Sequence, residues 1–540
     1  MVVAFGLGLF GVVSSQAGCG GGSSIDGTGG GSGGGDTGAA GNGAAGNAGP
    51  GTGGATSGTG GATSGGGGTT TTPTGGKSGT GGTGGGPTSG TGGAVTGAGG
   101  TPGGGGGVCG AGDTNLPAEP TLPATACATL QASFAIVTGT PPSETTLDTT
   151  RIQQALTACP VGQAVKLVQS GTSNGFITGP ITVPTGVTLW VDAGVTLFGT
   201  RNPTVYNNAP ALITVRGTNS GIVGDGTIDG QGGEPQIGGT QTWWDINGGG
   251  GSSPALIVVS SVTNFTLYRI TLHNSPMFHV KLAARGFVVW GVTVKTPTAA
   301  TNSVGTALNP NVAHNTDGID PGEAASNGFI VCSNISVGDD HIAIKGGTGV
   351  TNLLIAHNHF RSGHGMSIGS ETNGGVSGLN VYDLSIDGLG SGLGGGSSNG
   401  IRIKSDPSRG GLVTNATYSD ICTRNLANPI IITPMYTAVT GTLIPNYNGI
   451  TIRDFRSVAS TVVPNVTLLG FDSAHITGVA LDNVVIDGLT AAHIMATNAN
   501  VTLGPGNVNF MPTGTGVTVT NAISGTSTPN PCGADRFPMF

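Results

Sequence analysis

The chain has 540 residues, of which 107 are glycine, and only 8% are charged, with a formal net charge of −8. This sparse and negative charge argues against nucleic-acid binding, which requires a basic surface. The length would ordinarily suggest two or more domains, but a long glycine-rich stretch near the N-terminus leaves less protein for a core.

The N-terminal segment begins with an apolar run over residues 2–13, which is too short to span a bilayer. Two small residues, Ala17 and Gly18, then precede Cys19, as at the end of a bacterial lipoprotein signal. We interpret residues 1–19 as a signal peptide of the lipoprotein type, with a lipid anchor at Cys19; a plain export signal is the alternative. Both interpretations predict a protein that is secreted or held at the outer cell surface.

The next segment, residues 20–107, consists almost entirely of Gly, Ser, Thr, Ala and Pro and contains no aromatic residue. Such a stretch buries too little apolar surface to offset the entropy lost on ordering, so we expect a disordered, flexible linker. Val, Ile, Thr, Asn and Gly dominate residues 108–540, which predicts one large all-β domain.

Seven cysteines occur, at positions 19, 109, 127, 159, 332, 422 and 532. If Cys19 carries lipid, an even number remains, as expected of disulfides in an oxidising compartment. Cys127 and Cys159 flank a helix-like segment, residues 150–158, and we predict that these two pair. The partners of the other cysteines stay open.

Beyond residue 108 the chain is divided into short segments with strand-like alternation, separated by Gly, Asn, Asp and Pro. The segments recur at intervals of a few tens of residues, and no helical pattern between them is long enough for βαβ units. They span residues 187–197, 221–228, 264–272, 286–294, 328–337, 352–360, 379–386, 401–404, 413–421, 449–455 and 479–486.

This recurrence is typical of a solenoid, and we predict an all-β, right-handed parallel β-helix. In such a fold each coil stacks its strands on the next at about 4.8 Å, so residues one coil apart in sequence become neighbours in space. A β-sandwich is the main alternative. A β-propeller is disfavoured because no regular four-strand blade motif is present.

Two acidic motifs lie about one coil apart in the middle of this domain: Asn315-Thr316-Asp317-Gly318 and Gly338-Asp339-Asp340. Stacking would place Asp317 beside Asp339 on the outer surface, with Asp340 close by. Carboxylates so close cannot all ionise freely, so at least one should have a raised pKa and hold its proton. An acid beside a base is what hydrolysis of a glycosidic bond requires.

Arg402 and Lys404 alternate with Ile401 and Ile403, so both cations should face outward while the isoleucines enter the core. Fixed cations beside acid chemistry suit a substrate that carries a carboxylate. One coil beyond Asp339 and Asp340, His364 lies between two glycines, which let the backbone come close to a ligand.

Together these motifs resemble those of glycoside hydrolase family 28, the polygalacturonase family. Further motifs that carry the resemblance are the segment 224–232 followed by Trp243-Trp244, and the triplet Asn274-Ser275-Pro276. The resemblance covers roughly residues 126–488. It implies a parallel β-helix enzyme that hydrolyses α-1,4 bonds between galacturonate residues in pectin or polygalacturonate.

The resemblance also implies an inverting mechanism with defined roles for the acids. Asp339 would donate a proton to the leaving oxygen, while Asp317 and Asp340 would activate the attacking water. His364 would support the protonation of the acid.

For substrate binding, the resemblance implies that Arg402 and Lys404 hold a galacturonate on the leaving-group side of the cut. Asn315 and Tyr436 would contact the substrate. We expect no cofactor and no metal site, because His357 and His359 share a strand face without a carboxylate or cysteine at ligand spacing. The expected partner is an acidic polysaccharide, bound by a monomer.

Three alternatives stay open. A pectate or pectin lyase on the same scaffold would cut by elimination and would need calcium. Another activity within the family, such as a rhamnogalacturonan hydrolase, is the second, and a non-catalytic, surface-tethered glycan-binding protein is the third. The grouping of three acids with a histidine favours the hydrolase, and the motifs leave open whether it attacks chain ends or internal bonds and whether it tolerates methyl esters.

Overall fold

The computed structural model describes residues 109–389, 393, 396–458, 462–521 and 532–540. All of these belong to one compact unit, residues 96–540. The signal peptide, the lipid anchor at Cys19 and the linker over residues 20–107 lie outside the described residues and stay predictions. Within the described ranges, no helix has the length and apolar character needed to cross a membrane.

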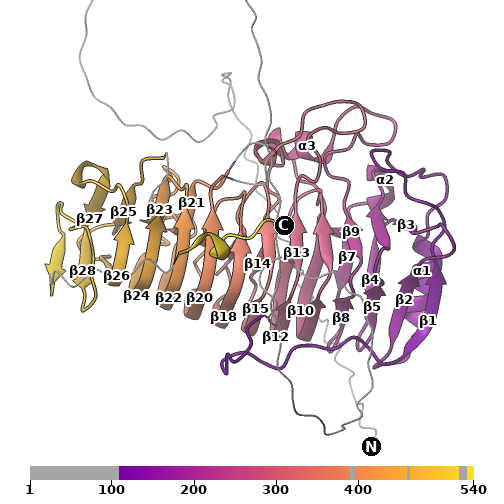
Figure 1. The fold of residues 1–540 in the computed structure, drawn as a ribbon, viewed down its shortest axis with the longest axis horizontal. Coiled ribbons are helices and arrows are strands. Elements are labelled where there is room, and N and C mark those ends of the chain that lie inside the picture. The colour runs from indigo at the N-terminus through magenta and orange to yellow at the C-terminus, as the bar shows by residue number, and fades with distance from the viewer. Residues whose placement is uncertain (1–108, 390–392, 394–395, 459–461, 522–531) are drawn as a thin grey trace, which may run out of the picture. The chain divides into compact units, whose positions relative to one another are not determined.

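Strands from successive coils pair in parallel along three ladders, which we call A, B and C. A strand in the middle of the stack pairs with its counterpart one coil before and one coil after, as Figure 1 shows. Long strands bend at the corners and take part in two ladders. The arrangement confirms the predicted parallel β-helix.

The strand bounds follow by ladder. Ladder A contains β1 (Ala126–Gln131), β2 (Ala164–Val168), β5 (Thr188–Val191), β8 (Gly221–Val223), β15 (Ser326–Val331), β28 (Ala499–Leu503) and β29 (Thr518–Thr520). Ladder B contains β3 (Gly175–Thr178), β6 (Thr196–Gly199), β9 (Thr227–Asp229), β11 (Thr271–His273), β13 (Thr293–Lys295) and β16 (Asn334–Ser336). Ladder C contains β4 (Ile181–Val183), β7 (Ala211–Val215), β14 (Ile319–Pro321), β17 (Ile342–Ile344), β19 (Met366–Ile368), β21 (Asn399–Lys404), β23 (Asn428–Thr433), β25 (Val466–Leu469) and β27 (Ile494–Thr497).

The remaining strands are shared between two ladders. Ladders C and A share β10 (Ala255–Tyr268) and β12 (Val280–Trp290). Ladders A and B share β18 (Val350–Phe360), β20 (Val376–Asp387), β22 (Leu412–Arg424), β24 (Asn446–Val458) and β26 (Thr477–Ile486).

The core lies inside the coils, where alternate residues of each strand stack on their counterparts. In ladder C, for example, Ile319, Ile342, Met366, Ile401 and Ile430 are paired in turn and are completely buried. Burying each such side chain contributes roughly 1.5–3 kcal/mol relative to exposure. The intervening residues point outward. On the outer face of a ladder, equivalent residues of successive coils therefore form rows of side chains.

The corner at which each coil enters ladder A is occupied by Asn or Gly in a left-handed backbone conformation. Asn264, Gly286, Asn327 and Asn352 occupy equivalent register positions, with φ values of 58°, 68°, 54° and 56°. Glycine has no Cβ to clash in this region, and asparagine is the side chain that tolerates it best. The repeated corner explains why Asn and Gly recur along the domain.

Helices are few among the described residues: α1 (Thr149–Ala158), α2 (Pro203–Tyr206) and α3 (Trp243–Gly248), with 3-10 turns at Pro310–Val312, Ala491–His493 and Ala534–Arg536. Helix α1 packs on the first coils through Ile152 and Leu156, which are buried. It matches the helix predicted over residues 150–158. The predicted Cys127–Cys159 disulfide beside it is confirmed.

Two further disulfides join the four cysteines whose partners the sequence left open. Cys109 is joined to Cys332, and Cys422 is joined to Cys532. Each of them connects residues more than one hundred positions apart, with sequence separations of 223 and 110. They attach the two ends of the described chain to the middle of the coil stack.

The C-terminal segment, residues 532–540, returns across the coils instead of continuing them. The carbonyl of Pro538 accepts a hydrogen bond from Arg361 (3.2 Å), and that of Phe540 accepts one from Lys295 (3.3 Å). Arg361 follows β18 and Lys295 ends β13, so the segment runs back toward earlier coils. In Figure 1 the C-terminus accordingly lies beside β13 and β14.

Candidate active site

The central acids lie where the chain enters successive strands of ladder C. Asp317, Asp340 and His364 each stand two residues before a paired core residue, so they occupy equivalent positions in three successive coils. The core residues concerned are Ile319, Ile342 and Met366. Sequence reasoning placed Asp317 beside Asp339; the register aligns it with Asp340, and Asp339 lies in the turn just before.

The turns that carry these acids are joined through Thr316 and Gly338. The hydroxyl of Thr316 donates to the carbonyl of Ala313 (2.7 Å) and accepts from the backbone N–H of Gly338 (3.0 Å). A Cβ at Gly338 would lie 2.2 Å from the same carbonyl, so only glycine fits. The Asn-Thr-Asp and Gly-Asp-Asp motifs are therefore one structural unit that brings the acids together.

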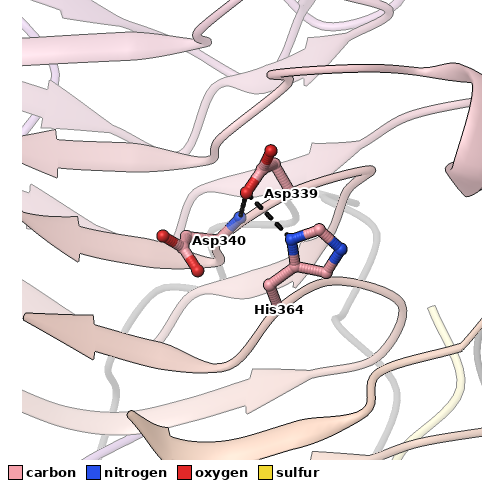
Figure 2. A group of neighbouring side chains, drawn as sticks. All are labelled: Asp339, Asp340 and His364. Carbon is pink, nitrogen blue, oxygen red and sulfur yellow. Dashed lines mark hydrogen bonds and ion pairs between the residues drawn. The ribbon is translucent and has the colours of Figure 1, made fainter. Parts of the chain in front are cut away.

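Asp339 and His364 form the more exposed part of the site. Oδ1 of Asp339 lies 2.9 Å from Nδ1 of His364 and also accepts the backbone N–H of Asp340 at 2.9 Å, as Figure 2 shows. The backbone N–H of His364 donates to the carbonyl of Asp339 at 2.8 Å. The two side chains are 22% and 41% exposed, so both can reach a ligand on the surface.

Asp340 is buried, with a side chain that is 1% exposed, and it is held by three groups from later coils. Lys404 donates to its Oδ2 (2.8 Å), and Ser367 donates to its Oδ1 (2.7 Å). A guanidinium nitrogen of Arg402 lies 3.6 Å from the same Oδ1. Asp340 is thus a fixed carboxylate, surrounded by positive charge.

Asp317 is buried beside a second carboxylate and a second lysine. Lys345 lies 3.5 Å from its Oδ2, and Asp320 follows three residues later in β14. Behind the pair, the backbone N–H of His279 donates to the carbonyl of Asp317 (2.8 Å). One oxygen of Asp320 is buried without a hydrogen-bond partner in the part of the chain that the structure describes.

The environment separates the pKa values of the buried acids. Burial, followed by the negative charge of Asp320, raises the pKa of Asp317 well above its usual value. Burial likewise raises the pKa of Asp320, to about 7. Burial would also raise the pKa of Asp340, but Lys404 and Arg402 outweigh it and lower that pKa. The pKa of Asp340 therefore favours its ionised form, whereas that of Asp317 is shifted towards the protonated form.

The Asp339–His364 pair behaves as one titrating unit. Burial would raise the pKa of Asp339, but the hydrogen bond and charge of His364 lower it. Burial would lower the pKa of His364, but Asp339 raises it. At least one of Asp317, Asp339 and Asp340 was expected to have a raised pKa. Of these three, Asp317 is the one whose pKa is raised. Within the pair of Asp339 and His364, both shifts favour a proton on the imidazole.

Arg402 and Lys404 face away from the coil interior, as predicted, but they are covered by other side chains and are only 7% and 4% exposed. The ring of Tyr436, after β23, covers both: its centre lies 5.2 Å from the Arg402 guanidinium and 4.9 Å from the Lys404 ammonium. Tyr436 itself is 37% exposed. Within the described residues, Nε of Arg402 is buried without a hydrogen-bond partner.

Asn315 is exposed at the turn two residues before Asp317, in a left-handed conformation with φ of 56°. Its position in the chain places it beside the acids. The predicted residues therefore all lie along the outer face of ladder C, from β14 to the turn after β23.

Sequence reasoning missed Asp320, Lys345 and Ser367. Ser367 and Arg402 are register partners in ladder C, Asp320 lies in β14, and Lys345 directly follows β17. The sequence did contain a pattern that could have revealed them. Each of the three residues stands one or three positions after the buried residue that begins a strand of ladder C. It was overlooked because these strands are three residues long and show no alternation.

The same side chains form a group that could hold a cation. Within the described ranges, one carboxylate oxygen each of Asp339 and Asp340 and a ring nitrogen of His364 lie within 4.8 Å of one another. All three already have partners, since Lys404 binds Asp340 and the other two bind each other. The two carboxylates of this group are therefore already paired with side chains of the protein.

Clustered carboxylates with separated pKa values, next to a histidine whose pKa is raised, form the apparatus of a glycoside hydrolase. Comparison with known proteins agrees. Residues 163–505 match the family described as Glycosyl hydrolases family 28. The chain therefore belongs to glycosyl hydrolases family 28, the polygalacturonase family.

Similar relatives include a polygalacturonase of Ralstonia nicotianae, 41% identical over 469 residues, covering 76% of this chain and 87% of the relative. An endo-polygalacturonase of Pectobacterium carotovorum is 39% identical over 378 residues, covering 65% and 85%. Among solved structures, a polygalacturonase from Erwinia carotovora superposes with a TM-score of 0.57 at 33% identity, covering 77% of this chain and 98% of the other.

Proposed function

We propose that this protein hydrolyses α-1,4 bonds between galacturonate residues in polygalacturonate and pectin. The observation that carries the proposal is the position of Arg402 and Lys404, two fixed cations next to the acids, where they can bind a sugar carboxylate. The names of the relatives, polygalacturonase and endo-polygalacturonase, support this substrate.

In the mechanism that we propose, Asp339 protonates the leaving glycosidic oxygen and His364 replaces the proton. The 2.9 Å hydrogen bond between them and the raised pKa of His364 support this division of labour. Substrate that approaches Asp339 takes a proton that the pair already holds. The glycosidic bond breaks with its electron pair on the protonated oxygen, which leaves as a hydroxyl group.

The attacking water gives up its proton to Asp340 together with Asp317. The lowered pKa of Asp340 supports a base that is ionised at working pH. Lys345, 3.5 Å from Asp317, opposes the rise that burial causes in the pKa of that carboxylate. Because water would attack from the face opposite the leaving group, the configuration at the anomeric carbon is inverted.

The test is to incubate the purified domain with polygalacturonate and to follow reducing ends, product lengths and the anomeric configuration of the first products. Hydrolysis with inverted products is expected, and products of intermediate length would indicate internal cutting. Unsaturated products that absorb in the ultraviolet would instead establish a lyase. Binding without new reducing ends would establish a glycan-binding protein.

We further propose that the protein acts outside the cytoplasm as a monomer, with lipid attached at Cys19. The three disulfides support an oxidising compartment. Mass spectrometry of the N-terminal peptide from the expressing cells tests the anchor, with Cys19→Ser as the control. A peptide that begins elsewhere or lacks lipid would contradict it, and the mass in solution tests the monomer.

A further inference from the structure

A third lysine lies on the outer face of ladder C, on the side of the acids opposite to Arg402 and Lys404. Lys281 in β12 is paired in register with Asp320 in β14, one coil before the buried acids. Val280 beside it is buried and Lys281 is exposed, so the lysine points out from the coil. Successive coils lie about 4.8 Å apart, which puts Lys281 next to the acid cluster.

Lys281 differs from the cations on the other side in having no carboxylate bound to it. Arg402 and Lys404 both pair with Asp340, whereas Lys281 takes part in no ion pair or hydrogen bond among the described residues. Its charge nevertheless acts on Asp320, which is its register partner in the next coil. A lysine whose charge is not paired with a carboxylate, and which lies on the same outer face as the acids, can bind an anion there.

An aromatic ring accompanies Lys281, as one accompanies the other two cations. The ammonium group lies 5.6 Å from the centre of the Phe278 ring, which is partly exposed. Phe278 stands two residues before Val280, which pairs with Ile319, so it occupies the register position that Asp317 occupies one coil later. Tyr436 plays the corresponding part beside Lys404. Each side of the acids therefore presents a cation next to an aromatic ring.

We propose that Lys281 and Phe278 form a second sugar-binding subsite, in which the lysine binds the carboxylate of a galacturonate residue on the side of the cut opposite to Arg402 and Lys404. The ring of Phe278 would pack against the apolar face of that sugar. This inference rests on the proposed function, because it takes the substrate to be a polymer of uronate residues. With a cation on each side of the acids, the substrate is held across the bond that breaks.

The variant Lys281→Gln tests the subsite, and Arg285→Gln is its matched control. Arg285 lies in the same strand and is also exposed, but it belongs to the ladder A part of β12, beyond the corner. Both variants remove one positive charge from the surface. A difference between them therefore reports position on ladder C and not net charge.

The first measurement is the KM and kcat of each variant on polygalacturonate. Lys281→Gln should raise KM roughly tenfold, the size expected when one hydrogen bond to a charged group is lost, with kcat unchanged. Arg285→Gln should match the wild type. Raising the methyl-ester content of the substrate should shrink the difference between Lys281→Gln and wild type, because esters carry no charge. Equal KM values for the two variants, or a difference that ignores esterification, would overturn the subsite.

The second measurement separates the subsite from catalysis. Calorimetry with polygalacturonate compares the Asp339→Asn variant with the double variant Asp339→Asn/Lys281→Gln. Weaker binding by the double variant is expected whether or not the wild type turns over substrate, so an inactive wild type with this result would overturn hydrolysis but keep the subsite. Equal binding by the two variants would overturn the subsite alone.

Discussion

Lys404 donates a 2.8 Å hydrogen bond to Asp340, although 64 positions separate them in the chain. The lysine is 4% exposed and the aspartate 1%. A buried pair of this kind fixes the ionisation of the carboxylate as well as its position. Lys404 therefore acts on the chemistry in addition to any contact that it makes with substrate.

Replacing Lys404 should consequently change more than substrate binding. In Lys404→Met the pKa of Asp340 rises, because burial is no longer opposed by the nearest cation. A base must be ionised, so activity on the acidic side is lost at a higher pH than in the wild type. The pH dependence of kcat measures the shift. Lys166→Met, which removes a lysine paired with Asp192 in the ladder A part of the fold, is the control; an unchanged acidic limb in Lys404→Met would contradict the role.

Asp339→Asn should abolish hydrolysis and leave the fold intact. The amide keeps the shape of the side chain but has no acidic proton to donate, and loss of a general acid costs about 10²–10⁴-fold in rate. Release of reducing ends measures the loss, and circular dichroism checks the fold. Asp225→Asn, which alters an exposed aspartate paired with Arg269, should remain active. Near-normal turnover by Asp339→Asn would remove the assignment of the acid.

His364→Asn should move the alkaline limb of the activity profile to lower pH. Asp339 raises the pKa of His364, so the pair keeps its proton up to a higher pH than either group alone. Activity that requires this proton is present below that pKa and is lost as the pH rises through it. Without the imidazole the proton is lost earlier. If activity falls equally at all pH values and the alkaline limb does not move, His364 has only a structural role.

Removal of divalent cations should leave activity unchanged. Lys404 and His364 already satisfy Asp340 and Asp339, which are the carboxylates closest to forming a cation site. Assay after treatment with a chelator measures this, with added calcium as the return control. Loss of activity that calcium restores would favour the lyase alternative.

His357 makes the stability of the fold depend on pH. It bridges Asp383 in β20 and Asp113 in the N-terminal segment, and these hydrogen bonds raise its pKa. A raised folded pKa means that the stabilisation is complete below the ordinary histidine pKa of about 6.5 and is lost as the pH rises through the folded value. His357→Gln should lower the thermal midpoint at acidic pH and little at alkaline pH. His493→Gln, whose partner is the neutral Asn465, is the control; equal losses at both pH values would contradict the assignment.

The sequence was informative about ladders A and B and less so about ladder C. Predicted segments such as 187–197 and 221–228 each contain two strands joined at a corner, β5 with β6 and β8 with β9. Most strands of ladder C, including β14 and β17, were not foreseen. Three residues are too few to show alternation, and only the stacking of neighbouring coils makes them strands.

The catalytic motifs were found because short polar motifs remain visible even where strands do not. Their protonation states could not be read in the same way. Asp317 and Asp340 look alike in the sequence, yet Lys404 holds one ionised while burial and Asp320 raise the pKa of the other. The decisive charges come from other coils, and their positions follow from the register.

The returning C-terminal segment changes how the coils depend on one another. In a solenoid each coil contacts only its neighbours, so unfolding can begin at one end and proceed stepwise. Here the Cys422–Cys532 bond and the contacts of Pro538 and Phe540 link the coils of β22, β18 and β13 through one C-terminal segment. The coils on both sides of the acids are thereby linked directly, so we expect fraying that begins at the far end of the stack to be opposed before it reaches them.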